Sequence, residues 1–361
     1  MREARVHRIA TSSPDDVTGL MAAIEAGRID PGGIIAILGK TEGNGCVNDF
    51  TRAFAVLALK QALSVYLNTA RIEAIAYVMS GGTEGALSPH LLVLERAEGA
   101  KADGASLAIG SALTALLPPE GLGRLAQVKM VADGVREAMA DAGIVDPNDV
   151  HFVQIKVPLL TSERIAAVET AGKTVATRDT LKSMGLSRGA AALGVGVALG
   201  ELDLSQIDDS LIGRDTSIWS SRASTSAGIE LGNHEIVVLG MSADWSGPLS
   251  VDHAVMNDAI DTAPVRQALD RLGIASDPSR LVALLAKAEP GTTGLLRGAR
   301  HTMLDDSDIS ATRHARAFVG GVLAGLVGTS EIFVSGGAEH QGPDGGGPVA
   351  LIATRTSGAA Q

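Results

Sequence analysis

The sequence has little cysteine and few aromatic residues. Its one cysteine, Cys46, excludes a disulfide bond within the chain and is typical of a protein from the reducing cytosol. Trp, Tyr and Phe together make up only 2% of the 361 residues, while hydrophobic residues as a whole make up 45%. The interior must therefore be built from small aliphatic side chains, chiefly those of Ala, Val, Ile and Leu.

Long hydrophobic runs and a basic surface are missing as well. No uninterrupted apolar run reaches the length of about 20 residues that crosses a bilayer, and the N-terminal stretch MREARVHRIA lacks the apolar core of a signal peptide. The net charge of -11 and the lack of a basic stripe argue against binding of nucleic acid or of an anionic membrane. We expect a soluble, cytoplasmic protein whose partner is a small molecule.

A short phrase occurs three times in the chain. Residues 80–84 read SGGTE, residues 226–230 read SAGIE and residues 335–339 read SGGAE. Each copy has a Glu four residues after the Ser, and an apolar run comes soon after every copy. A strand, a Gly-rich turn and a second strand are the simplest interpretation. Three copies in one chain indicate an internal repeat.

The elements around these copies recur in one order. Each third of the chain reads helix, strand ending in Lys, loop, helix opened by Arg, strand leading to Ser, turn and strand. The recurring cations are Lys40, Lys156 and Lys287, and Arg52, Arg188 and Arg316. We predict an α/β fold of three repeats, residues 1–103, 104–250 and 251–361, around a pseudo-threefold axis, forming a barrel-like prism with helices outside.

This recurrence favours a shared ligand site over separate structural roles. A Lys at a strand end is commonly a solvated edge residue, and a Ser in a Gly-rich turn commonly makes only a local bond. An Arg that opens a helix is less common, because the helix dipole disfavours a cation there. Separate roles do not explain why three residue types recur in one order. A lining of Lys, Arg and hydroxyl groups suits a small, planar, acidic ligand that carries carbonyl groups.

The same residue types suit acyl transfer. A serine hydroxyl becomes a nucleophile when a base takes its proton, and a neutral Lys can be that base. Burial and neighbouring cations lower the pKa of a lysine from its usual value of about 10.4. This reasoning does not choose among the three Lys–Ser pairs, and it leaves open a protein that binds its ligand without turning it over.

Four stretches carry a family resemblance. They are SGGTEG at 80–85, STSAGIE at 224–230, SGGAEHQGPDGG at 335–346 and RGARHTMLDDSDISATRHARAFVGG at 297–321. Over nearly the whole chain the sequence resembles the cyanuric acid hydrolase and barbiturase family, whose three repeats form a triangular, barrel-like prism. The resemblance implies hydrolysis of a cyclic amide, either cyanuric acid, which opens to carboxybiuret and then gives biuret and carbon dioxide, or barbituric acid. The two rings differ at one position, N–H against CH₂, and the residues do not tell them apart.

The resemblance also implies roles for single residues. It places the nucleophile at Ser226 and its base at Lys156. It implies substrate contacts at Arg52, Ser80, Gly81, Arg188, Ala227, Arg316, Ser335 and Gly336. Arg316 is preferred to the nearby Arg313, because the helix that Arg316 opens matches the earlier Arg helix.

Two further lysines belong to the predicted site. Lys40 and Lys287 hold the position of Lys156 in the other two repeats, so they complete the lining around the ligand. We expect them, together with Arg188, to lower the pKa of Lys156 by repulsion, provided that all converge on one axis.

A divalent cation and a homotetramer are implied by the resemblance as well. The Glu289 carboxylate would hold a structural Ca²⁺ or Mg²⁺, since hard cations prefer oxygen ligands. Backbone oxygens of the loop AEHQGPDGGG at 338–347 would complete the ligands, at Ala338, Gln341, Gly342, Pro343 and Gly346. A plain Gly-Pro turn beside a surface Glu is the alternative. No organic cofactor is implied.

Other patterns are weaker. GVGVALG at 194–200 has the wrong glycine spacing for a nucleotide loop, and DDSD at 305–308 is too short for a calcium loop. Nothing near Cys46 marks it as a nucleophile. Seven of the eight histidines show no metal-binding spacing along the chain: His90, His151, His234, His253, His301, His314 and His340.

Overall fold

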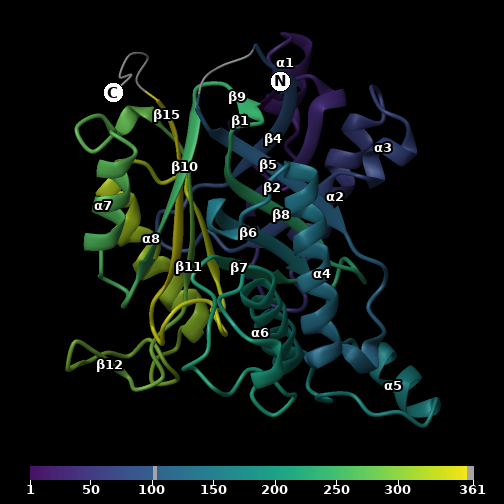
Figure 1. The fold of residues 1–361 in the computed structure, drawn as a ribbon. Helices are drawn as coiled ribbons and strands as arrows, with labels where there is room; N and C mark the ends of the chain where they lie inside the picture. The colour runs from purple at the N-terminus through teal and green to yellow at the C-terminus, as the bar shows by residue number, and fades with distance from the viewer. Residues whose placement is uncertain (101–103, 356–361) are drawn as a thin grey trace.

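The computed structural model describes residues 1–100 and 104–355. Its strands form three sheets of four or five strands and one small two-stranded sheet, and helices lie on the outer sides of the larger sheets (Figure 1). The predicted α/β class is therefore confirmed. The strands of the described residues form separate sheets and close no single barrel, so that part of the expected prism is not observed.

The first sheet contains five strands. They are β1 (Arg2–Ala10), β2 (Ile34–Thr41), β3 (Ala76–Gly81), β4 (His90–Glu98) and β9 (Trp245–Ser246). Their order is β3-β2-β4-β1-β9, in which β2 and β3 are parallel and β4 is antiparallel to β2. The register of the parallel pair sets Lys40 opposite Ser80. A buried lysine and a serine thus lie side by side where two strands end.

The second sheet has an equivalent order. Its strands are β5 (Ser106–Leu113), β6 (Val150–Val157), β7 (Ala223–Ala227) and β8 (Glu235–Ser242). They are arranged β5-β8-β6-β7, which read backwards matches the first four strands of the first sheet. The parallel strands β6 and β7 set Lys156 opposite Ser226.

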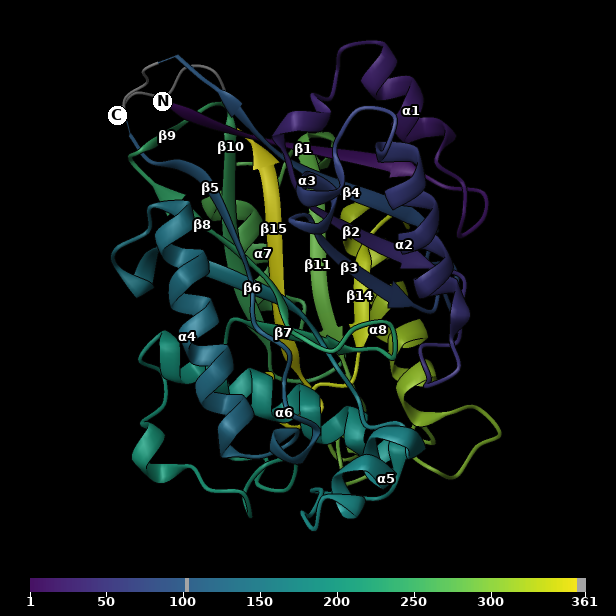
Figure 2. The same cartoon turned by 90° about the vertical axis from the view of Figure 1, so that its right-hand side faces the viewer.

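The third sheet repeats this arrangement. Its strands are β10 (Leu249–Met256), β11 (Leu281–Ala288), β14 (Phe333–Gly336) and β15 (Gly347–Thr354). They are ordered β10-β15-β11-β14, and the parallel pair β11 and β14 sets Lys287 opposite Ser335. The short strands β12 (Leu295–Leu296) and β13 (Ala299–Arg300) form the separate two-stranded sheet. Figure 2 shows β11, β14 and β15 beside the strands of the other sheets.

The helices of the described residues are α1 (Thr18–Glu25), α2 (Phe50–Leu63), α3 (Thr69–Glu73), α4 (Leu125–Ala142), α5 (Ser162–Thr170), α6 (Thr180–Ala198), α7 (Ala263–Arg271) and α8 (Ala311–Val327). Two of them, α6 and α8, begin well before the arginine that is predicted to open them. Asp179 accepts a hydrogen bond from a backbone N–H and caps α6, so that helix starts well before Arg188. Arg316 likewise lies inside α8. The prediction that these two arginines open helices is wrong, and the dipole penalty does not apply to them.

Side chains from all three large sheets meet in one central hydrophobic cluster. Leu38 and Val78 come from the first sheet, Ile155 from the second, and Leu285 and Phe333 from the third, and all are buried. Burying each such side chain stabilises the fold by roughly 1.5–3 kcal/mol. This shared core holds the Lys-bearing ends of the sheets near one another.

The predicted division of the chain stays a prediction. The boundary after residue 103 lies outside the described residues, and the boundary after residue 250 falls within β10. In the part of the chain that the structure describes, no helix is long and apolar enough to cross a membrane.

Candidate active site

The ends of the Lys- and Ser-bearing strands surround a small cavity of about 20 Å³. Its lining consists of Gly45, Arg52, Ser80, Gly81, Lys156, Met184, Arg188, Ser226, Ala227, Arg316, Ser335 and Gly336. The residues shared with a larger outer cleft of about 660 Å³ are Gly45, Met184, Arg188, Arg316 and Gly336. The inner cavity therefore has an entrance.

The structure brings most of the predicted site residues to this cavity. The residues for which the resemblance implies substrate contact all line it, together with Ser226 and Lys156. Lys40 and Lys287 lie just behind the lining, so Lys156 is the lysine that faces the cavity. Arg313 lines the outer cleft and not the inner cavity. Gly45 and Met184 had no sequence signal.

The three lysines are almost completely buried, each with about 1% of its surface exposed. Each donates a hydrogen bond to the carbonyl oxygen of the residue just before the Ser of another sheet. The pairs are Lys40 to Val334 at 2.8 Å, Lys156 to Met79 at 2.5 Å and Lys287 to Thr225 at 2.8 Å. Each lysine therefore connects its own sheet to a neighbouring one.

Two lysines also hydrogen-bond the serine of their own sheet. Lys40 Nζ donates to Ser80 Oγ at 3.5 Å, and Lys287 Nζ donates to Ser335 Oγ at 3.2 Å. Lys287 Nζ additionally donates to the Gly336 carbonyl oxygen at 2.9 Å. These serines are therefore held by a buried amine.

The pair predicted to be catalytic differs from the other two. Between Lys156 and Ser226, both of which the structure describes, there is no direct hydrogen bond. Lys156 Nζ instead lies 2.9 Å from Glu230 Oε1. Ser226 Oγ lies 2.8 Å from Ser335 Oγ, so its hydroxyl shares a hydrogen bond with another serine of the cavity.

The glutamate of each repeated phrase pairs with an arginine from another segment of the chain. The ion pairs are Arg52–Glu230 at 3.3 Å, Arg188–Glu339 at 2.6 Å and Arg316–Glu84 at 2.5 Å. The last two are bidentate. Sequence reasoning noticed these glutamates but gave them no role, although their fixed position after the Ser was the available signal.

Glycines of the phrases make room for two of these arginines. Gly82 has a φ of 108° and Gly337 a φ of 78°, which a residue with a side chain rarely adopts. A Cβ at Gly82 would clash with the Arg316 guanidinium, and a Cβ at Gly337 would clash with that of Arg188. The second glycine of the phrase is therefore needed to position the arginine as well as to form the turn.

The pKa of Lys156 is lower than that of an ordinary lysine. Burial lowers the pKa of Lys156 to about 8, with a further lowering by Arg52, while Glu230 opposes both. The predicted repulsion by Lys40 and Lys287 is not among the main causes. Arg52, on α2, is the cation that has this effect.

The pKa values of the other two buried lysines are lowered as well. Burial lowers the pKa of Lys40 and of Lys287 well below the usual value, and Arg316 and Arg188, respectively, lower each pKa further. Both amines donate hydrogen bonds to neighbouring oxygens.

The residues expected to hold a cation lie beside this site. Glu289 accepts hydrogen bonds from the Gly337 N–H at 2.8 Å and from Thr312 Oγ1 at 3.2 Å. Burial and the nearby Glu339 carboxylate raise the pKa of Glu289 to about 7. Within the loop, the Gln341 N–H donates to the Ala338 carbonyl oxygen at 2.9 Å, which closes a turn. Two crowded carboxylates next to a carbonyl-rich turn fit a hard cation.

Relatives of known activity match the chain along its length. The profile of a family described as amidohydrolase ring-opening protein matches residues 5–354. The cyanuric acid amidohydrolase of Azorhizobium caulinodans is 63% identical over 356 residues, which cover 98% of this chain and 99% of the relative. That of Ectopseudomonas oleovorans is 53% identical, covering 97% of this chain and 99% of the relative.

Solved structures also match the chain along its length. The crystal structure of the cyanuric acid hydrolase from A. caulinodans matches with a TM-score of 0.94 at 62% identity, covering 99% of this chain and all of that one. A second cyanuric acid hydrolase structure matches with a TM-score of 0.94 at 48% identity, covering 98% of this chain and all of that one. The resemblance that the sequence motifs indicated is therefore confirmed. The chain belongs to the family of ring-opening amidohydrolases that contains the cyanuric acid amidohydrolases.

Proposed function

We propose that the protein hydrolyses cyanuric acid, opening the ring to carboxybiuret, which then loses carbon dioxide to give biuret. The observation that carries this proposal is the lining of the inner cavity, where three serines and three arginines meet one buried lysine. Cyanuric acid presents three equivalent carbonyl and N–H positions, so a lining that offers the same groups three times matches its symmetry. The names of the relatives support the same substrate.

The proposal includes a pseudo-threefold axis through the cavity, with three repeats forming an open, triangular prism. The equivalent strand orders and the equivalent Lys–Ser registers support it. The Arg–Glu pairs join the segments in one cyclic direction, and the Lys–carbonyl bonds join them in the other. Such cyclic contacts are expected of three repeats that close on one another.

In the proposed mechanism, Ser226 is the nucleophile and Lys156 the base. Ser226 Oγ attacks a ring carbonyl carbon while neutral Lys156 takes the hydroxyl proton. The ring C–N bond then breaks, and Lys156 returns the proton to the leaving ring nitrogen. Water hydrolyses the resulting acyl-enzyme, which releases carboxybiuret and restores the serine hydroxyl.

Two features support Lys156 over the other lysines. Lys156 faces the cavity, whereas Lys40 and Lys287 lie behind it. Its pKa of about 8 also lies near neutral pH, where a group can both accept and release a proton. In this mechanism the Lys156 amine moves from Glu230 toward Ser226 when substrate binds, because catalytic hydrogen bonds often form only in the complex.

The remaining cavity groups bind the ring. Backbone N–H groups at Gly81, Ala227 and Gly336 and the three arginines would donate to the carbonyl oxygens, including the one that gains negative charge. Ser80 and Ser335 accept hydrogen bonds from Lys40 and Lys287. These two serines would bind the two ring positions that do not react. A ring held in this way keeps its reacting carbonyl near Ser226.

We also propose a structural cation at Glu289, held with backbone oxygens of Ala338, Gln341, Gly342, Pro343 and Gly346. A Ca²⁺ or Mg²⁺ there would offset the charge of Glu289 and of the nearby Glu339; burial and, after it, that second carboxylate raise the pKa of Glu289. The catalytic steps above do not pass through it. Removal of the ion by a chelator should lower the melting temperature of wild-type protein but not that of Glu289→Gln.

The decisive assay is turnover of two candidate substrates. Purified protein is incubated separately with cyanuric acid and with barbituric acid, and loss of ring absorbance and formation of biuret are followed. We expect cyanuric acid to be consumed, with Lys156→Ala lowering kcat by a factor of about 10³ or more. Consumption of barbituric acid alone would make the protein a barbiturase. No turnover of either by folded protein would favour a protein that only binds its ligand.

A further inference from the structure

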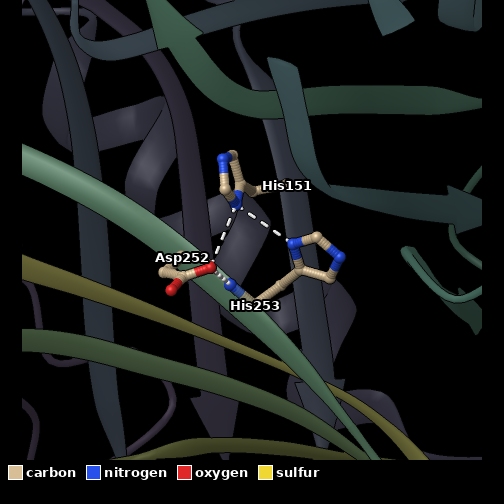
Figure 3. Close-up of side chains that lie close together, drawn as sticks. All are labelled: His151, Asp252 and His253. Carbon is tan, nitrogen blue, oxygen red and sulfur yellow. Dashed lines mark hydrogen bonds and ion pairs between the residues drawn. The ribbon is translucent and has the colours of Figure 1, made fainter. Parts of the chain in front are cut away.

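A second group of ligand-type side chains lies far from the cavity. His151 on β6 faces Asp252 and His253 on β10, as Figure 3 shows. One potential ligand atom of each residue lies within 4.8 Å of the others. Lys156 stands five residues further along β6, roughly 17 Å away for an extended strand. The group is therefore separate from the proposed active site.

We propose that His151, Asp252 and His253 form a binding site for a divalent transition-metal ion of the zinc class. Four ligands at about 2.0–2.1 Å from a tetrahedral ion lie about 3.3 Å from one another. His151 Nδ1 is 3.0 Å from His253 Nδ1 and 3.5 Å from Asp252 Oδ1, which brackets that separation. Two imidazoles and a carboxylate are a common zinc donor set, with water as a fourth ligand.

The surrounding contacts orient these ligands. Arg271 Nε donates to Asp252 Oδ2 at 2.6 Å, which leaves Oδ1 on the side of the two rings. The two Nδ1 atoms point at each other, so one of them carries a proton in the metal-free protein. An ion between them would replace that proton and bind both lone pairs. Such fixed orientation of the ligands is a known contribution to metal affinity.

Charged groups of both signs surround the three ligands. Arg271 contacts Asp252, and Arg222 and Glu201 lie near His253. Arg222 Nε is 3.0 Å from Glu201 Oε1, so the Glu201 carboxylate offsets the Arg222 charge beside the group.

An ion at this site would join two parts of the fold. β6 belongs to the second large sheet and β10 to the third. Each side chain is partly exposed, so an ion has access from solvent. A bound ion stabilises the folded state by mass action. An ion at this site would therefore stabilise the contact between the two sheets.

Cobalt binding tests the proposal without any use of activity. The full-length protein is stripped with a chelator and titrated with Co²⁺, whose visible absorption is intense in a tetrahedral N/O site. We expect one such site in the wild-type protein and binding at least about tenfold weaker in both His151→Ala and His253→Gln. Zn²⁺ should displace the cobalt and raise the melting temperature of the wild-type protein.

Two control variants separate this site from others. Glu289→Gln removes the carboxylate of the proposed hard-cation site, and His301→Gln removes a histidine outside the group. Both should keep the wild-type cobalt spectrum. If the wild-type protein gives no tetrahedral spectrum, or if the spectrum survives unchanged in both His151→Ala and His253→Gln, the proposal is overturned. Circular dichroism establishes that each variant is folded, and these outcomes do not depend on the substrate of the active site.

Discussion

Lys156 Nζ lies 2.9 Å from Glu230 Oε1 at the edge of the inner cavity. The equivalent glutamates, Glu84 and Glu339, are instead each held by two hydrogen bonds from an arginine. Glu230 therefore stabilises the charged form of a lysine and raises its pKa against the effect of burial. This contact separates one Lys–Ser pair from the other two.

Replacing Glu230 with Gln should change the pH profile of catalysis. Without the carboxylate, the pKa of Lys156 falls below its value of about 8, so the neutral base persists to lower pH. The acidic limb of the kcat/KM profile should move to lower pH in Glu230→Gln. It should stay in place in the matched variant Glu339→Gln, whose carboxylate pairs with Arg188. An unmoved limb in Glu230→Gln would show that Lys156 is not the titrating base.

The Arg316–Glu84 pair, in which Arg316 is buried and Glu84 is partly exposed, should contribute to stability as a coupled unit. Arg316→Met leaves the Glu84 carboxylate without its partner, and we expect a loss of about 1–3 kcal/mol in the free energy of unfolding. The double variant Arg316→Met/Glu84→Gln should lose less than the sum of the single losses, because no unpaired charge remains. Denaturant unfolding of the four proteins measures this coupling. Purely additive losses would mean that the pair does not connect the segments energetically.

Glu235 should make stability fall as the pH rises toward neutral. Burial raises its pKa from 4.5 to about 7, so the folded state holds this proton more tightly than the unfolded state does. Stability from this group is therefore present below pH 4.5 and declines through the interval up to about 7. The side chain in Glu235→Gln stays neutral at every pH. The free energy of unfolding of this variant should therefore fall by up to about 3 kcal/mol less than that of the wild type across the interval. Glu163 is exposed, so the stability of Glu163→Gln should depend on pH as that of the wild type does. If the stability of Glu235→Gln shows the same pH dependence as the wild type, the raised pKa of Glu235 is contradicted.

A homotetramer remains the expected assembly. Phe50, Phe54 and Leu57 are exposed by 72%, 47% and 62% on one side of α2, which is costly for a helix in contact with water. We expect light scattering at micromolar concentration to give four times the chain mass, and Phe54→Glu to give a smaller mass. A monomeric wild-type protein would rule the tetramer out.

Much of the fold was predictable because the recurring strands are strongly apolar. The pattern predicts a strand at residues 32–40, and the structure has β2 at Ile34–Thr41. β1 at Arg2–Ala10 was not predicted, because charged residues interrupt its alternation and it is only partly buried. Its stability comes from pairing with β4, a contact that local sequence does not reveal.

The site was predictable where residues recur and not where distant segments meet. Lys and Ser share one register in each sheet, so repetition identified them. The partner of Arg188 stands 151 residues away at Glu339, and nothing local marks the pair. His151 and His253 are 102 residues apart, which is why no metal-binding spacing was visible along the chain.

The most direct test of the central claim is to identify the serine that carries the acyl group. Protein mixed with cyanuric acid is quenched with acid during turnover, digested, and its peptides are weighed by mass spectrometry. Our account predicts an adduct on the peptide that contains Ser226, its loss in Ser226→Ala, and its survival at reduced yield in Ser80→Ala and Ser335→Ala. An adduct on Ser80 or Ser335 that persists in Ser226→Ala would contradict the account.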